Sequence, residues 1–470
     1  MRPSSVRAFS ALAGLGPLVL AVWVCGVTPP SALGVPPAKA VKAGARAKTP
    51  PTYTKDVAPI LQQKCQNCHR RNQVGPFPLE TYGQARKRAS DIATVVSDRQ
   101  MPPWKPAPGV GPKLKHDQSL TREEIATLGE WAEAGAPQGD PKDMPPPPRF
   151  ADGWKLGPPD LILEPAEDFP FAAGAPDTYR CFVIPTNLAK DTYISAIDFR
   201  PSNTRIVHHI NAFLDTSGEA RKKDEAEPGS GYTSFSGPGI DTYEDLSFWA
   251  AGHVPSHLPP GIGQRLPRQS DVILQVHYHG TGKPEVDRTR IGLYFSREPV
   301  KQALHWSTAS NSDFHLPAGA SNVEVKASWL IPTDVEALAV SPHMHLLGHD
   351  MRMTVTSPTG KTRDLIQIPE WDPAWQSCYY FQKPIPITRG SVVRVIAHYD
   401  NSAHPRNPNH PPKPVTWGHG AHDEMCEGFI AVVKAGQDLT KPRSTDDLAE
   451  IFSRQRMKNM PLRQTTKPPH

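Results

Sequence analysis

Proline is the feature that most restricts what this chain can fold into. Of the 470 residues, 54 are proline, about 11% and roughly twice the ordinary share. Because proline lacks an amide N–H and fixes its own φ angle, we do not expect extensive helix in this chain. Glycine shows no repeating period and apolar stretches recur, which excludes a collagen-like or wholly disordered chain. The formal charge of +5, without a long basic run, gives no support to a nucleic-acid partner.

The first forty residues have the pattern of an export signal. Arg2 and Arg7 precede an apolar run from Ala11 to Val24, and residues 38–40 offer a small-x-small cleavage site. A permanent single-span anchor is the alternative, although the apolar run is near the lower length limit for spanning a bilayer. We therefore predict a signal peptide at 1–40 and an exported protein, periplasmic or extracellular, that stays membrane-anchored only if the signal is uncleaved.

A cysteine motif follows the predicted signal. Cys65 and Cys68 precede His69 in the C-x-x-C-H pattern of covalent c-type haem attachment. Two thiols one helical turn apart can reach the two vinyl groups of a porphyrin, and the next residue then presents an imidazole to iron. A zinc half-site or a redox dithiol is the alternative, but zinc would need a second Cys/His pair nearby. Met101, in a proline-flanked strap, is the expected second axial ligand, with ordinary core packing as its alternative.

The residues around this motif predict helices. Thr121–Glu124 has the pattern of a capping box, Leu128 and Trp131 follow on one helix face, and Gly135 is a stop signal. With its C-x-x-C-H motif, the segment 41–139 resembles class I cytochrome c domains. The resemblance implies that the motif helix and a C-terminal helix pack beside a covalent haem c.

Beyond a proline-rich linker at residues 140–160, the chain has the pattern of a β protein. Seventeen of the nineteen histidines lie after residue 200. Short apolar or alternating segments are punctuated by Gly, Pro, Asn and Asp, as in the strands of β-sandwiches. The tail carries one short helical pattern at Asp446–Arg454. The predicted strands are Ile206–Asp215, Val272–Tyr278, Ile291–Phe295, Val335–Ser341, Met351–Thr356, Val392–Tyr399 and Glu427–Val433.

Three histidine pairs lie in or beside these strands. His208 and His209 are adjacent, so on a regular strand they would face opposite sides, and joint use on one metal requires a strand end or a bulge. The other two pairs are spaced i, i+2 and share a face. For any single histidine the alternative is an ordinary surface or core residue, but three pairs in one β-rich chain favour metal binding. The i, i+2 pairs are His277 with His279 and His343 with His345.

Met425 adds a sulfur donor. It lies in a polar loop that enters an apolar run, where core packing is not the obvious reason for a methionine. A thioether beside two imidazoles selects Cu(I) over zinc, because soft sulfur suits the softer ion. Taken alone, ordinary packing remains the alternative.

Four motifs in order carry a resemblance to a known family, over roughly residues 160–435. The chain resembles the copper type II, ascorbate-dependent monooxygenases, that is, the peptidylglycine α-hydroxylating and dopamine β-monooxygenase family. The resemblance implies two antiparallel eight-stranded jelly-roll domains, each carrying one copper ion. The motifs are Val207–Ile210, Leu274–Tyr278, His343–Gly348 and Asp423–Cys426.

The resemblance also implies two ligand sets. One would bind an electron-transfer copper on the first jelly roll, and the other would bind the oxygen-activating copper, which is the catalytic one, on the second. The sets are His208, His209 and His277 for the first ion, and His343, His345 and Met425 for the second.

The chain departs from the family at the substrate positions. Ser341 stands where the peptide-amidating members have an arginine, and Glu427 and Phe429 stand where they have Asn and Tyr. Those family residues hold a peptide carboxylate, so we do not expect a peptidylglycine substrate. The disulfide pattern is thinned as well: Cys181 resembles a family cysteine whose usual partner is missing. Cys378 and Cys426 could pair and leave Cys181 free, which the sequence alone does not decide.

We therefore predict a copper-dependent monooxygenase that hydroxylates an aliphatic C–H bond of a small organic substrate with O₂. Electrons would reach the copper ions through the fused haem from a periplasmic donor, or from an ascorbate-like reductant. A non-catalytic periplasmic protein that transfers electrons or binds copper is the alternative. A zinc hydrolase is disfavoured because methionine is a poor zinc ligand.

The predicted architecture is a small all-α cytochrome c-like domain followed by two all-β antiparallel jelly-roll sandwiches. The predicted boundaries are 1–40 for the signal peptide, 41–139 for the haem domain, 140–160 for the linker, 161–298 and 299–436 for the two copper domains, and 437–470 for a polar tail.

Overall fold

The computed structural model covers most of the chain after residue 48. No helix within this described part is long and apolar enough to cross a membrane. The predicted signal peptide lies outside the described residues. The described ranges are 49–71, 73–150, 153–235, 237–250, 252–418, 420 and 422–459.

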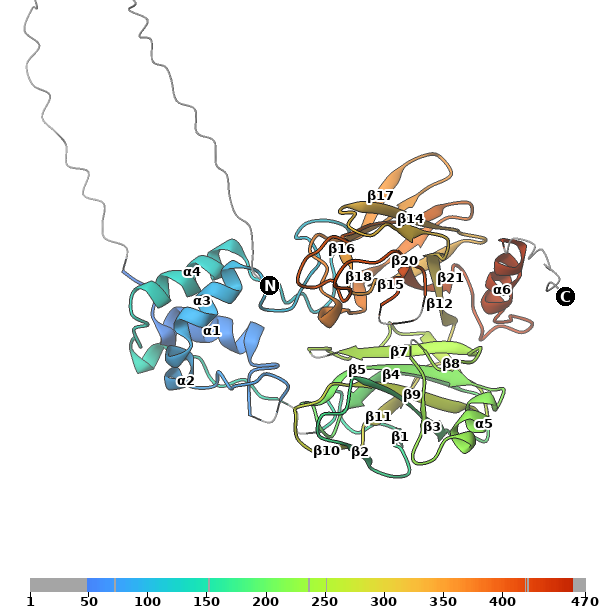
Figure 1. Ribbon diagram of the computed structural model, residues 1–470. Coiled ribbons are helices and arrows are strands. Elements are labelled where there is room, and N and C mark those ends of the chain that lie inside the picture. Colours follow the sequence, from blue (N-terminus) through green and yellow to red (C-terminus); the bar gives the residue numbers. More distant parts are fainter. Residues whose placement is uncertain are drawn as a thin grey trace, which may run out of the picture. The chain divides into compact units, whose positions relative to one another are not determined.

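Helices occupy the chain between residues 53 and 143 (Figure 1). The first three helical pieces run without a break into the C-x-x-C-H motif. The helical character was expected from the sequence, whereas a cytochrome c domain stays a prediction. The elements are η1 (Tyr53–Val57), α1 (Ala58–Ile60), η2 (Leu61–Cys65), α2 (Tyr82–Lys87), α3 (Ala89–Ser97), α4 (Arg122–Glu133) and the short turn η3 (Pro141–Asp143).

Local sequence explains where α4 begins and ends. The Thr121 hydroxyl accepts a hydrogen bond from Glu124 N at 3.1 Å, and the Glu124 carboxylate accepts one from Thr121 N at 2.7 Å. This reciprocal pair is the predicted capping box, and it satisfies two amides that a helix start leaves free. Leu128 and Trp131 are fully buried on one face, and Gly135 follows with φ of +80°, a conformation that glycine adopts without strain. The predicted helix is therefore confirmed.

The first sandwich packs two sheets over a shared apolar core. One sheet has five strands, and the other layer comes from half of a longer sheet. A two-stranded ribbon of β2 (Phe169–Phe171) and β10 (Glu285–Asp287) is separate. The five-stranded sheet, in spatial order, is β6 (Tyr232–Thr233), β3 (Thr178–Pro185), β9 (Asp271–Tyr278), β5 (Val207–Asp215) and β7 (Glu244–Ala250). The opposing layer is β1 (Leu161–Leu163), β11 (Arg290–Phe295), β4 (Thr192–Arg200) and β8 (Ile262–Leu266).

The second sandwich has four strands in each layer within the described residues, which gives the eight strands expected, whereas the layers of the first sandwich have five and four strands, so the expected eight is wrong there. Its core is built from both layers. A small ribbon pairs β13 (His315–Leu316) with β20 (Val415–Thr416). One layer is β12 (Gln302–Asn311), β21 (Cys426–Lys434), β15 (Val335–His343) and β18 (Tyr379–Ile387). The other is β14 (Val323–Leu330), β19 (Val392–Tyr399), β16 (Gly348–Thr356) and β17 (Thr362–Ile368), and the turn η4 (Pro373–Trp375) lies between β17 and β18.

One sheet runs through both sandwiches. Strands β8 and β12 pair in parallel, with Gln302 opposite Ile262 and Ala303 opposite Gly263. This short pair joins four strands of each sandwich into an eight-stranded sheet. The prediction of purely antiparallel sandwiches is therefore wrong at this junction, because a parallel contact between two predicted domains has no signature in either strand alone.

The predicted strands are confirmed, with ends that differ by a few residues. The tail helix is also present, as α6 (Leu448–Asn459). Helix α5 (Glu219–Ala226) was not predicted, because only Ala220 of its eight residues is buried and the apolar periodicity is missing.

Candidate metal centres

The first histidine cluster is held by two neighbouring strands. His208 and His209 come from β5 and His277 from β9. The register between these strands shifts from Val207 opposite Tyr278 to His209 opposite His277. One extra residue therefore sits in β5 at His208, which is the bulge that two adjacent histidines need to face one site.

The ring nitrogens of this cluster converge. The Nδ1 atom of His208 lies 3.1 Å from Nδ1 of His209 and 3.2 Å from Nδ1 of His277. Metal–nitrogen bonds of about 2.0–2.1 Å place two ligand nitrogens about 3.3–3.6 Å apart on one ion. The cluster is the one group of at least three His, Cys, Asp or Glu side chains in the described chain whose donor atoms all lie within 4.8 Å of one another.

Neighbouring side chains orient the His277 ring. Its Nε2 atom lies 3.1 Å from a carboxylate oxygen of Asp177, so Nε2 carries the proton and Nδ1 keeps its lone pair for the cluster. Tyr179 stacks on the same ring at 4.1 Å between centroids. His279, the predicted partner of His277, instead bonds Asp177 at 2.8 Å and is not in the cluster.

Burial keeps these rings neutral. It is the main cause that lowers the pKa of His277 to about 4, with the neighbouring imidazole of His208 adding to it. Burial and nearby imidazoles also lower the pKa of His209 well below its usual range. A neutral imidazole is the form that binds a metal ion.

The second set comes from a strand end, a loop and the start of another strand. His343 is the last residue of β15, His345 lies two residues later, and Met425 precedes β21. The two imidazole centroids are 5.2 Å apart, and Met425 is buried. All three side chains line the same cavity.

Hydrogen bonds fix both histidine rings of this set. His343 Nδ1 lies 2.6 Å from Oε1 of Gln376, and His345 Nδ1 lies 3.0 Å from the backbone oxygen of Asp423. Both partners are acceptors, so each Nδ1 carries the proton and each Nε2 is left with a lone pair. The second set thus presents Nε2, whereas the first presents Nδ1.

The Glu424 carboxylate connects the loop after β15, which carries His345, to Met425 before β21. Its carboxylate accepts backbone hydrogen bonds from His345 at 2.8 Å, Leu347 at 2.6 Å and Met425 at 3.3 Å. Burial raises the pKa of Glu424 to about 8, although these three N–H groups oppose the rise. Sequence reasoning missed both Glu424 and Gln376. Glu424 stands inside a motif that was noted, but nothing local shows that it bonds residues 79 positions away.

One cavity of about 710 Å³ is lined by both sets. Its described lining contains no lysine and no arginine, and its acidic side chains are Asp177, Asp245 and Glu427. Burial, with the nearby charge of Asp245, raises the pKa of Glu427 to about 7. The aromatic lining residues are Tyr179, Phe213, Phe235, Phe248, Trp306 and Phe429.

The C-x-x-C-H residues lie at the end of the first helical stretch. His69 Nδ1 is 3.0 Å from the backbone oxygen of Phe77, which leaves Nε2 for a ligand. Cys65 and Cys68 are free thiols, and burial raises the pKa of Cys65 to about 12. Met101 lines a hollow next to α3 and α4. None of the three motif residues lines that hollow.

The considered disulfide between Cys378 and Cys426 is not formed. All five cysteines of the described chain are free. Cys426 belongs to the main core of the second sandwich, whereas Cys378 packs against a separate cluster beside β12. Cys181 is buried and free as well.

The family match found by comparison with known proteins falls on the second sandwich. Residues 310–440 match the family model described as the C-terminal domain of the copper type II ascorbate-dependent monooxygenases. This match supports a copper-dependent oxidoreductase of the monooxygenase type. No curated protein matches the chain.

Solved structures give only distant likenesses. The VP2 subviral particle of infectious bursal disease virus is 12% identical over 62% of this chain and 75% of that chain, with a TM-score of 0.19. The major capsid protein P2 of bacteriophage PM2 is 9% identical over 61% and 99%, with a TM-score of 0.23. PNGF-II is 7% identical over 58% and 65%, with a TM-score of 0.24. TM-scores this low support no inference about fold or function.

Proposed function

We propose that this chain is an exported, copper-dependent monooxygenase that hydroxylates an aliphatic C–H bond of a small organic substrate with O₂. The observation that carries the proposal is the single cavity lined by both ligand sets, in a chain whose residues 310–440 match the monooxygenase family model. When bound, two copper ions supply the one-electron and O₂ chemistry that no amino-acid side chain provides.

The donor chemistry of the second set suits Cu(I). The thioether of Met425 is the soft donor that favours Cu(I) over zinc, and the two imidazole nitrogens suit copper as well. Burial, reinforced by the neighbouring His345, lowers the pKa of His343 to about 4, so its ring stays neutral at physiological pH. Three protein donors fall short of a full set of four, which leaves a position for a reactant.

The first set suits storage of a second electron equivalent. Its three imidazole nitrogens converge on rigid paired strands, and no sulfur donor is part of the cluster. The cavity between the sets has aromatic walls that exclude water and hold an apolar substrate. Because no lysine or arginine is among the described residues that line it, a substrate anchored by its carboxylate does not fit this lining.

We also propose that Cys65, Cys68 and His69 hold a c-type haem. The support is the motif spacing and the His69 Nδ1 bond to Phe77, which leaves Nε2 for iron. Met101 lines a hollow that these three residues do not line, so its role as the second axial ligand stays a prediction from the sequence. When bound, the haem supplies single-electron relay from a periplasmic donor or an ascorbate-like reductant.

Copper loading combined with isotope labelling tests the proposed activity. The full chain is loaded with copper, supplied with ascorbate and a mixture of small organic compounds, and exposed to ¹⁸O₂. We expect the wild type to bind two copper ions and to form a product that carries one ¹⁸O atom. The His343→Ala variant should form no such product. The non-catalytic copper-binding alternative would be favoured if the wild type binds two copper ions but forms no labelled product and consumes no more O₂ than His343→Ala.

A further inference from the structure

A strap from the helical segment lies against the second sandwich. We define the strap as residues 101–118, between α3 and α4. Lys115 N donates to the Tyr380 oxygen at 2.7 Å, and Gln382 N donates to the Lys113 oxygen at 2.8 Å. Leu114 pairs with Phe381 as an antiparallel bridge. Because β18 is the last strand of its sheet, the strap covers an edge that would otherwise expose unpaired backbone groups.

The beginning of the strap holds the loop that leads into β18. The Trp104 ring meets the Tyr379 ring edge to face at 5.4 Å. Lys105 Nζ lies 3.8 Å from a carboxylate oxygen of Asp372, and 12% of the Lys105 side chain and 34% of the Asp372 side chain are exposed. These contacts lie on both sides of residues 373–378, which we call the wall loop.

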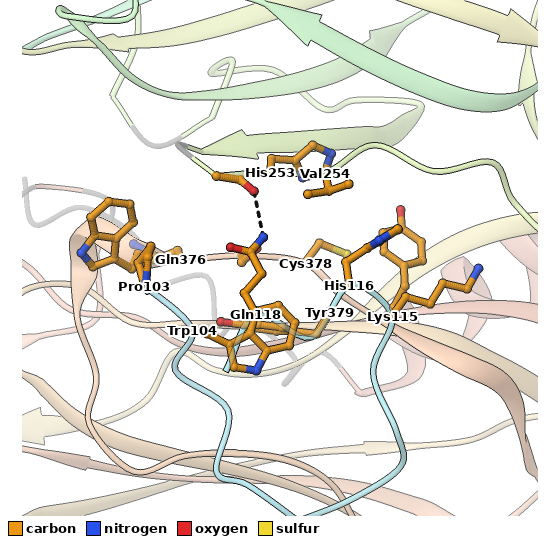
Figure 2. Close-up of a pocket in the computed structure, with 14 residues that line it drawn as sticks. Pro103, Trp104, Lys115, His116, Gln118, His253, Val254, Gln376, Cys378 and Tyr379 are labelled. Carbon is orange, nitrogen blue, oxygen red and sulfur yellow. Dashed lines mark hydrogen bonds between the residues drawn. The ribbon is translucent and has the colours of Figure 1, made fainter. Parts of the chain in front are cut away.

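The wall loop carries Gln376, the residue that bonds His343. Gln376 Nε2 donates to the Pro373 oxygen at 3.1 Å, which leaves Oε1 to accept from His343 Nδ1 at 2.6 Å. Figure 2 shows Trp104 and Gln118 of the strap on the same hollow as Gln376, Cys378 and Tyr379. Gln376 and Cys378 line both this hollow and the central cavity, so the wall loop separates the two.

The other hydrogen bonds of the wall loop come from within the second sandwich, and those in its middle are local: Ala374 N donates to the Asp372 carboxylate at 3.0 Å and Trp375 N to the Asp372 backbone oxygen at 3.0 Å. The start of the loop is fixed by Trp371, whose indole N–H donates to the His345 oxygen at 3.0 Å. Near its end, the Ser341 hydroxyl donates to the Ser377 oxygen at a long 3.3 Å. The remaining hydrogen bond of the Gln376 side chain is to Pro373, within the same loop. The strap is therefore the main structure outside the second sandwich that holds this loop in place.

We propose that the strap is part of the second metal centre: by clamping the wall loop, it holds Gln376 on His343 and thereby orients the imidazole toward the metal. Gln376 is then a positioning residue, and Trp104 and Lys105 act through it. The partner of the second ring nitrogen sets the tautomer and orientation of a histidine ligand. The proposal rests on the proposed function, because it takes His343 as a copper ligand. It makes the segment with the C-x-x-C-H motif a structural component of the site for oxygen chemistry.

The first test uses the metal-free full chain. Long-range ¹H–¹⁵N spectra of ¹⁵N-histidine protein report the tautomer of each ring, and the His343→Ala variant assigns the signal. We expect His343 to carry its proton on Nδ1 in the wild type and in Gln376→Glu. In Gln376→Leu the ring should shift toward the Nε2–H tautomer, and in Trp104→Ala it should shift in the same direction by a smaller amount. Gln302→Leu, which removes one side-chain bond to a backbone oxygen elsewhere, and Trp154→Ala are the matched controls and leave the signal unchanged.

The second test measures copper in the full chain by isothermal titration and electron paramagnetic resonance. Loss of the partner of a ligand histidine costs 10–100-fold in metal affinity. We expect Gln376→Leu to lose copper affinity by this factor at the second site, and Trp104→Ala to lose less there. Copper affinity at the first site should not change in either variant. If Trp104→Ala does not fold, Lys105→Met removes the ion pair with Asp372 and serves in its place.

The outcomes separate the proposal from the function it rests on. An unchanged tautomer and unchanged second-site affinity in both strap variants would overturn the role of the strap. Unchanged values in Gln376→Leu would overturn the role of Gln376. Two full-affinity copper ions in His343→Ala would instead contradict the proposed function, while the tautomer shifts in the metal-free chain would still decide whether the strap holds Gln376.

Discussion

The two ligand sets face one cavity but are built in different ways. The first set sits on paired strands β5 and β9, and its geometry follows from one bulge in a regular ladder. The second is assembled from the end of β15, the loop after it and the residue before β21, and it relies on Glu424 and Gln376 to hold its parts. A strand-based site is preorganised by backbone pairing, whereas a loop-based site depends on a few side-chain bonds.

This difference has a chemical counterpart. The rigid set offers three nitrogen donors, which suits an ion that only exchanges electrons. The loop-based set offers mixed nitrogen and sulfur donors, which suits an ion that changes its ligands during a reaction. We therefore expect disruption of single supporting residues to affect the second set more than the first.

The largest expected effect is on activity and tests the sulfur donor. Met425→Ala should lower product formation by about 100-fold or more, because even loss of a supporting partner of a ligand costs 10–100-fold. Copper at the first set should remain, as counted by metal analysis after dialysis. Met351→Ala, which removes a core methionine without touching the cavity, is the control for packing. Undiminished turnover in Met425→Ala would remove the chemical distinction between the two sets.

The next prediction concerns the joint between the two sandwiches. His305 on β12 lies between Glu244 of β7 at 3.0 Å and Asp446 of the tail at 2.8 Å. Burial lowers the pKa of His305, but the hydrogen bonds and charges of the two carboxylates outweigh burial and raise it to about 10. A raised folded-state pKa means that this stabilisation is complete below about pH 6.5 and is lost as the pH rises to about 10.

Urea unfolding between pH 6 and 10 measures this loss. The contribution of His305 to the free energy of unfolding should fall by at most about 1.4 kcal/mol per pH unit, so the wild type should lose stability with rising pH more steeply than His305→Gln. His315→Gln, at an exposed histidine, is the control. Equal pH slopes in the wild type and His305→Gln would show that this joint does not hold the two regions together through a charged imidazole.

A third prediction tests the side-chain support of the second set. Glu424→Ala leaves three backbone N–H groups without their acceptor, two of them in buried hydrogen bonds and one in a partly buried one, and an unsatisfied buried donor costs about 1–3 kcal/mol. We expect the free energy of unfolding to fall by about 3 kcal/mol, measured by urea denaturation, and second-site copper affinity to fall with it. Glu324→Ala, at an exposed glutamate, should change neither. A loss confined to the first site would contradict the assignment of Glu424.

The smallest expected effect is on the first set. Asp177→Asn weakens the acceptor for His277 Nε2, and about half of the Asp177 side chain is exposed, so water can replace part of the bond. We expect first-site copper affinity to fall about 10-fold, the low end for such partners, with the second site unchanged. Asp168→Asn is the matched control. A loss as large as that in Gln376→Leu would show that the first set is no more rigid than the second.

Much of this architecture follows from local sequence patterns. Alternating apolar residues place β5, β9, β15 and β21, and the adjacency of His208 and His209 requires the bulge that the structure has. The capping box before α4 is likewise local. Such features depend on residues within a few positions of one another, so the sequence displays them directly.

The rest depends on contacts between distant residues. Gln376 lies 33 positions from His343 and Glu424 lies 79 positions from His345, and neither pairing leaves a local pattern. The parallel pair of β8 with β12 and the docking of the strap on β18 are similarly long-range. The Cys378–Cys426 disulfide that we considered is absent from the described structure. Residue type alone does not show that these two thiols belong to different apolar clusters.

X-ray absorption on the reduced, copper-loaded protein tests the central claim most directly, because it counts the sulfur atoms bound to copper. The account predicts one copper–sulfur bond per two copper ions in the wild type and none in Met425→Ala, with the nitrogen shell otherwise kept. A wild-type spectrum with nitrogen donors only, or a sulfur bond that persists in Met425→Ala, would contradict it.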